Sequence, residues 1–204
     1  MAVEKNYRAT TGVDEFHYGT LDETGVGVTS MDPERVKFLQ EITIEMPQEA
    51  VRAYGDNTTA EIAVSNGNIS VTSAFHKVPV EDKKILFGLE STVDGLYSYG
   101  PNDFPPYVAC VFAKTYQDGS TEWVGLPKGI FMRPNISSKT KEDSVEFQNE
   151  EITAEFMDRE VEGFEDAKSV LFGMDKKGET TSRDAIFQAI FGKAYPGSGA
   201  PAGV

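Results

Sequence analysis

Cysteine and histidine are scarce in this chain, and their scarcity excludes two kinds of site. Cys110 is the sole cysteine, so an internal disulfide cannot form, and one cysteine with two histidines cannot supply a standard zinc site of four Cys/His ligands. Cys110 lies in the apolar run from Tyr107 to Phe112, which predicts a small buried core residue rather than a reactive thiol. His17 and His76 each follow a phenylalanine, and we expect structural or surface roles for them rather than general-base catalysis.

Long apolar runs and basic residues are also in short supply. Nowhere are about eighteen apolar residues consecutive, and Met1 to Arg8 contain no apolar run of signal-peptide length, so we expect neither a membrane span nor export. Nineteen Lys and Arg stand against 33 Asp and Glu, which gives a net charge of -14. Proteins that grip nucleic acid use clustered cations, so binding to nucleic acid by contact is not expected.

The sequence contains no recognisable catalytic or cofactor-binding motif. Gly-x-Ser-x-Gly, a phosphate-binding loop and a dinucleotide fingerprint are all missing. With 33 acids, a pair resembling the carboxylates of a glycosidase is expected by chance. The acids after Glu142 lack the spacing of a calcium loop, although loose binding of a divalent ion stays open. We therefore predict a protein that is not an enzyme and uses no cofactor.

What the chain does have is acid, concentrated in one segment. Between Glu142 and Asp166, eleven carboxylates accompany a single base, Arg159, so this segment has a net charge of -10. Apolar residues recur in it at period two, which is typical of a strand with one buried face and one acidic face. Their parity changes midway, which predicts a bulge or bend between Gln148 and Glu151. The apolar residues are Val145, Phe147, Ile152, Ala154, Phe156, Val161 and Phe164.

Strand patterns dominate the remaining sequence. Residues Ile42, Ile44 and Met46 alternate with acids and a threonine, so this strand too has one apolar and one largely acidic face. Asn66-Gly67 and Asp118-Gly119 each predict a tight hairpin turn, because these residue pairs adopt the required positive φ angles. In the second hairpin, Trp123, Ile130 and Met132 are expected to pack. The expected strands are Val13 to Leu21, Val36 to Met46, Glu61 to Ser65, Asn68 to Thr72, Tyr107 to Tyr116 and Thr121 to Met132.

Helices are the minority. The spacing of apolar residues predicts one helix over Val80 to Leu89 and another over Ser182 to Gly192, the latter with Ser182 as its N-cap. We expect one mainly β domain over residues 13–195, preceded by an N-terminal arm of residues 1–12. Residues 196–204 are rich in proline and glycine and should form a flexible tail.

One polar motif and the order of the elements carry a resemblance. The motif begins with Arg133-Pro134-Asn135-Ile136, continues with Thr140-Lys141-Glu142-Asp143-Ser144, and ends with Glu146, Gln148 and Glu151-Ile152. Together with the hairpins and the two helices, it resembles the major tail tube proteins of long-tailed, non-contractile bacteriophages, from about Val13 to Tyr195. The resemblance implies two packed antiparallel sheets, as a β-sandwich or barrel, with a flanking α-helix and one further short helix.

The same resemblance implies a structural, self-assembling role. Subunits would form hexameric rings that stack into a hollow tube in the virion, after assembly in the host cytoplasm, alongside tape-measure, distal tail and tail-terminator proteins. DNA would pass through the lumen without adhering. The acidic strand faces fit such a lining, because acids repel phosphates. The candidate lumen-facing residues are Glu41, Thr43, Glu45, Glu151, Thr153 and Glu155.

A second reading of the sequence remains open. The chain would then be a monomeric β-sandwich that binds, for instance, carbohydrate, through the aromatic stretch from Tyr97 to Tyr107. If the chain assembles, the connections from Asp22 to Glu34 and from Val93 to Pro106 are candidates for subunit or ring contacts, because they are long for a compact domain.

Overall fold

The chain folds as a mainly β structure with two helices. The computed structural model describes residues 7–22, 24–25, 27, 32–56, 58–136 and 148–197. The predicted fold class is confirmed, and the sheets do not close into a barrel. The elements are β1 (Thr10–Thr20), β2 (Glu34–Val36), β3 (Leu39–Glu45), β4 (Gln48–Gly55), β5 (Thr58–Asn66), β6 (Ile69–Phe75), α1 (Val80–Phe87), β7 (Glu90–Ser91), β8 (Tyr97–Ser98), β9 (Val108–Tyr116), β10 (Thr121–Phe131), β11 (Glu150–Phe156), β12 (Leu171–Asp175) and α2 (Thr181–Phe191).

The body is a sandwich made from one antiparallel series of strands that folds over on itself. The strand order is β2-β1-β9-β10-β11-β6-β3, and β12 pairs with the first half of β10. The sheet bends within β10, at the point where the register between β10 and β9 shifts between Leu126 and Gly129. Pro127 sits at this shift, a position where a strand tolerates proline because the ladder is already interrupted.

Two cores lie on opposite faces of β9. Val108, Cys110 and Phe112 point into the core between the two halves of the sandwich, and the intervening Ala109 and Val111 point into a second core beneath α2. A strand buried on both faces explains the uninterrupted apolar run there. The expectation that Cys110 is a buried core residue is confirmed, because its exposed fraction is 0%.

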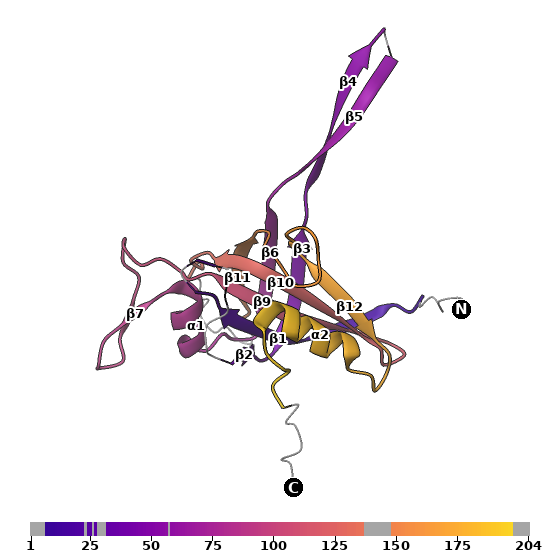
Figure 1. Cartoon of the computed structure of the whole chain (residues 1–204). Helices are drawn as coiled ribbons and strands as arrows, with labels where there is room; N and C mark the ends of the chain where they lie inside the picture. Colours follow the sequence, from indigo (N-terminus) through magenta and orange to yellow (C-terminus); the bar gives the residue numbers. More distant parts are fainter. Residues whose placement is uncertain are drawn as a thin grey trace, which may run out of the picture.

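Helix α2 lies on the outer face of β10 and β12 (Figure 1). It approaches closely because Gly125 has no side chain: a Cβ there would lie 2.7 Å from Ile190 Cγ1. The predicted N-cap, Ser182, is wrong, since the helix begins one residue earlier. The buried carboxylate of Asp175, at the end of β12, accepts hydrogen bonds from the backbone N–H groups of Ser182 (2.7 Å) and Arg183 (2.9 Å). Asp175 therefore performs the capping that the sequence assigned to Ser182.

Strands β4 and β5 form a long hairpin that stands away from the body (Figure 1). The predicted hairpin through Asn66-Gly67 is therefore wrong: β5 pairs with β4, and β6 pairs with β3 and β11. At the base of this long hairpin, Gly67 N–H donates to Pro47 O (2.9 Å) and Gln48 Nε2 donates to Asn66 Oδ1 (3.0 Å). The hairpin predicted through Asp118-Gly119 is confirmed by the pairing of β9 with β10.

The connection after helix α1 forms a second projection, with the short β7–β8 hairpin at its end (Figure 1). Leu86 and Phe87 of α1 are buried in the first core, and Gly88 ends the helix in the left-handed conformation (φ 64°). Arg133 holds the connection by donating to Gly100 O (2.5 Å) and Asp103 O (3.0 Å).

Candidate functional site

The six candidate lumen residues lie together on one outer face of the sandwich. Strand β6 runs between β3 and β11, and both neighbours are in register with it, so that directly opposed side chains point to the same side. We call this surface the acidic face. Its three rows are Glu41, Ala74 and Glu151; Thr43, Thr72 and Thr153; and Glu45, Ser70 and Glu155.

The buried apolar residues on the other side of the same strands determine which side chains point outward. In β11, Ile152, Ala154 and Phe156 are 1%, 1% and 3% exposed, whereas Glu151 and Glu155 are exposed. Ile42 and Ile44 of β3 pack against the same core. A slip of one residue in either pairing would place charged side chains in the core, so the alternation holds the register.

The acidic face carries negative charge without compensation from its own strands. The sequences of β3, β6 and β11 contain no lysine or arginine. Glu41 and Glu151 flank Ala74 at two strand spacings, or about 10 Å. This separation is about one Debye length at physiological salt, so the charges coexist, and the small side chains of β6 keep them apart.

The acidic face also includes residues that we expected elsewhere. Ile130 pairs with Glu155 and is only partly buried, and Met132 is 41% exposed, so neither packs in the core as predicted. The register shift after Leu126 is the reason. Before the shift, even-numbered residues of β10 face the first core, whereas after it the odd-numbered Phe131 faces that core, so Ile130 and Met132 point outward. The predicted bulge between Gln148 and Glu151 depends on Val145 and Phe147, which lie outside the described residues.

Family comparison agrees with this architecture. A family model described as phage tail tube protein matches residues 18–194. The chain belongs to the phage tail tube protein family. It is accordingly a structural component of a phage tail and of the virion. No curated protein sequence matches it.

One solved structure similar to the chain is the cryo-EM structure of the anti-feeding prophage (AFP) baseplate, 6-fold symmetrised. The two chains share 9% sequence identity, and the match covers 85% of this chain and 97% of the other with a TM-score of 0.39. At that TM-score the likeness supports no conclusion about assembly.

Not every acid of this tail tube protein belongs to the acidic face. Glu150 points to the opposite side, where it accepts hydrogen bonds from Lys83 Nζ (2.8 Å) and from Val78 N–H (2.9 Å). Burial alone would raise the pKa of Glu150, but Lys83 and the Val78 N–H outweigh it and lower the pKa. Three carboxylates of the acidic segment predicted from the sequence lie outside the described residues: Glu142, Asp143 and Glu146.

A second group of acids lies in the loop after β11, which we call the acidic loop (residues 160–166). Arg159, the one base of this segment, is turned inward: it is 6% exposed and its Nη2 donates to Ile190 O (2.7 Å) and Ala189 O (3.3 Å) at the end of α2. Arg159 thereby fastens the loop to the helix and leaves the loop carboxylates uncompensated. These are Glu160, Glu162, Glu165 and Asp166.

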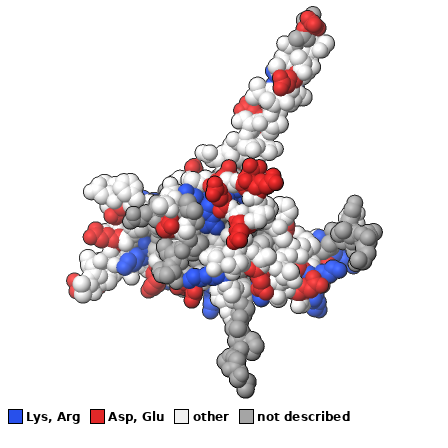
Figure 2. Space-filling model, viewed as in Figure 1, with Lys and Arg blue, Asp and Glu red and all other residues white. Residues whose placement is uncertain are grey.

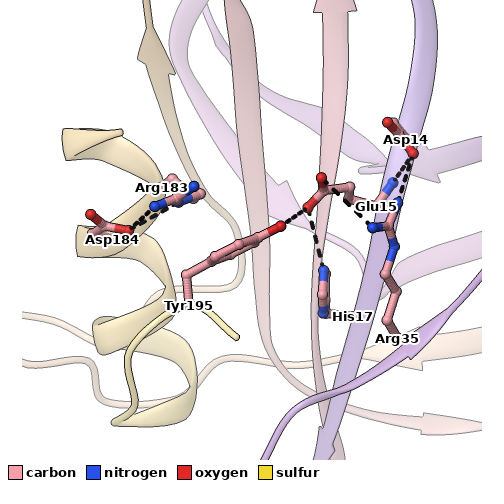
Figure 3. A network of polar contacts seen from close by, with 7 residues as sticks. All are labelled: Asp14, Glu15, His17, Arg35, Arg183, Asp184 and Tyr195. Carbon is pink, nitrogen blue, oxygen red and sulfur yellow. Dashed lines mark hydrogen bonds and ion pairs between the residues drawn. The ribbon is translucent and has the colours of Figure 1, made fainter. Parts of the chain in front are cut away.

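The segment after α2 is fastened to β1 by a polar network (Figure 3). Glu15 has a left-handed backbone (φ 52°) at a bulge in β1, and its carboxylate accepts a 2.7 Å hydrogen bond from the Tyr195 hydroxyl. His17 Nε2 lies 3.5 Å from the same oxygen, and Arg35 Nη1 lies 3.8 Å from the other. His17, then Tyr195 and Arg35, hold the pKa of Glu15 below its usual value against the effect of burial.

Burial and the Glu15 carboxylate raise the pKa of Tyr195 to about 12, so its hydroxyl remains a donor at neutral pH. His17 itself is 2% exposed and packs edge-on against Phe187 and Tyr195. The structural role predicted for His17 therefore agrees with its position, and His76 lies at the surface.

Within the described ranges, no three His, Cys, Asp or Glu side chains are grouped to hold a metal ion. Neither α1 nor α2, the helices of the described part of the chain, is long and apolar enough to cross a membrane.

Of the two connections predicted to make subunit contacts, the one from Val93 to Pro106 exposes Val93, Leu96 and Phe104. Much of the other, from Asp22 to Glu34, lies outside the described residues.

Proposed function

We propose that the chain polymerises into the tube of a non-contractile phage tail, in stacked and hexameric rings, with the acidic face lining the channel for DNA. The observation that carries this proposal is the face itself: four glutamates on strands without a single lysine or arginine. Phosphates adhere to proteins through Lys and Arg. A wall of this composition repels the genome and leaves it free to slide.

The edges of the sheet favour assembly side by side. Among the strands that the structure describes, β3 is the last of the series, and its residues Leu39–Glu45 pair there with β6 on one side only. An unpaired edge of seven residues is a template for a further strand. In the proposed ring, a neighbouring copy covers this edge, so that the acidic faces join into a continuous lining.

The rest of the proposal follows from the family resemblance. Residues 13–195 form the tube domain, with residues 1–12 and 196–204 as terminal extensions. The subunits assemble in the host cytoplasm together with tape-measure, distal tail and tail-terminator proteins.

Electron microscopy of the purified protein tests the proposal. Tubes or rings of uniform width are expected, and small monodisperse particles at high protein concentration and in salt would refute self-assembly.

The role of the acids is tested separately by replacing Glu151 and Glu155 with lysine. Particles with these changes should deliver DNA poorly, because lysines in the channel bind phosphates. Normal tubes with undiminished delivery would remove the acidic lining from the account.

A further inference from the structure

The long hairpin has two different faces. The pairings of Arg52 with Ile62 and of Ala50 with Val64 place these four residues on one face. We call this the Arg52 face. Ile62 and Val64 are 57% and 62% exposed there. The opposite face carries Glu49, Val51, Ala53, Glu61 and Ala63.

An isolated two-stranded ribbon with an apolar face is at best marginally stable in water. Removing Ile and Val side chains from water is favourable, so the hairpin is stabilised when a second surface covers the Arg52 face. The hairpin points away from the body, so no surface of the described body covers this face (Figure 1).

A groove on the body is suited to this face. It has a volume of about 490 Å³ and lies between the acidic loop and α2. Leu171, Ile186 and Ala189 line it, and Phe164 and Phe172 border it with exposed fractions of 53% and 75%. We call it the α2 groove.

The Arg52 face and the acidic loop beside the groove carry charges of opposite sign. Arg52 is the single basic residue between Gln48 and Asn66, and none of the ion pairs within the described part of the chain includes it. Glu162 lines the α2 groove, beside the other three carboxylates of the acidic loop. Lys168 also lines the groove, with its Nζ 5.8 Å from the centroid of the Phe164 ring, but one lysine against four carboxylates leaves this region net negative. Figure 2 shows how little positive charge the long hairpin carries.

From these observations we infer that the Arg52 face of one copy docks in the α2 groove of a second copy, with Arg52 against Glu162. The occupant is a second copy of this chain, so the inference rests on the proposed self-assembly. This contact would join copies at a place other than the edge of β3. The apolar side chains supply the affinity, and the Arg52–Glu162 pair sets the orientation.

Charge reversal tests the pairing. R52E and E162R should each raise the protein concentration needed for tube formation about tenfold or more, and R52E/E162R should recover most of that loss. The matched control is E61R, a reversal on the opposite face of the hairpin, which should shift the concentration less than about threefold. Loss in both single variants without any recovery in the double variant would overturn the pairing.

Cross-linking tests the same contact without disturbing assembly. Ile62→Cys and Phe164→Cys are made in separate preparations, which are mixed, assembled and treated with a short bismaleimide. Cys110 does not interfere, because it is fully buried. A cross-linked dimer is expected, and Ala63→Cys in place of Ile62→Cys should give far less of it.

The outcomes separate this inference from the function on which it rests. Tubes that form without the cross-link, and that R52E leaves unaffected, would overturn the groove contact while self-assembly stands. A wild-type chain that forms no tubes or rings would overturn self-assembly, and the groove contact with it.

Discussion

Replacing Asp175 with alanine should loosen α2 from the body. The Asp175 carboxylate is 2% exposed and accepts two short hydrogen bonds from the first turn of the helix. Losing a capping side chain costs about 0.5–2 kcal/mol, and leaving a buried N–H unsatisfied costs about 1–3 kcal/mol. We expect D175A to lower the free energy of unfolding by about 2–3 kcal/mol, and Tm by roughly 5–10 °C for a chain of this size.

The assay is urea unfolding followed by the fluorescence of Trp123, whose ring centroid lies 5.9 Å from that of Phe187 in α2. D175N keeps one carbonyl acceptor and should lose about half as much stability. D184A is the matched control, since Asp184 lies in the same turn but is exposed, where it pairs with Arg183 and accepts a hydrogen bond from Thr180 Oγ1 (3.1 Å). D175A within about 0.5 kcal/mol of wild type would refute the capping role.

Three further predictions concern packing, pH and salt. Gly125→Val should displace α2, because a Cβ there already meets Ile190; a loss of stability below about 1 kcal/mol in urea unfolding would show that the helix adapts. Tyr195→Phe should cost about 1 kcal/mol at pH 7. The pKa of Glu15 is lowered in the folded chain, so the stability from ionised Glu15 is present above its unfolded pKa of about 4.5 and is lost as pH falls through its folded pKa. The difference between wild type and Tyr195→Phe should therefore shrink in acid, and a constant difference would contradict the network. Added NaCl should promote polymerisation, because a ring of six subunits gathers about 84 negative charges; light scattering that falls steadily with salt would contradict this.

The alternation in the sequence predicted the outward side chains of β3 and β11, namely Glu41, Thr43, Glu45, Glu151, Thr153 and Glu155. The alternation of Glu151, Ile152 and Thr153 has a strong energetic cause, because a slip would bury carboxylates, and the same holds around Ile42. What no local pattern contained was the strand between them. β6 joins β3 to β11 by pairings between residues about 30 and 80 positions apart, and only tertiary structure decides these.

The errors in prediction have local causes. Asn66-Gly67 has the composition of a hairpin turn, yet it connects the long hairpin to the body, where Gly67 N–H bonds to Pro47 O. The long hairpin itself was missed because its residues are exposed on both faces and create no core pattern. Ile130 was misplaced because the register shift at Pro127 reverses the parity of β10, and one strand's sequence does not reveal where its ladder breaks.

The proposal that the acidic face lines the channel for DNA is best tested by the orientation of this face in an assembled tube. A cryo-EM map of tubes grown from the purified chain, at a resolution that traces the strands, would locate β3, β6 and β11. We expect Glu41, Glu45, Glu151 and Glu155 to border the central channel. A map with these four glutamates on the outer wall, or buried between subunits, would contradict it.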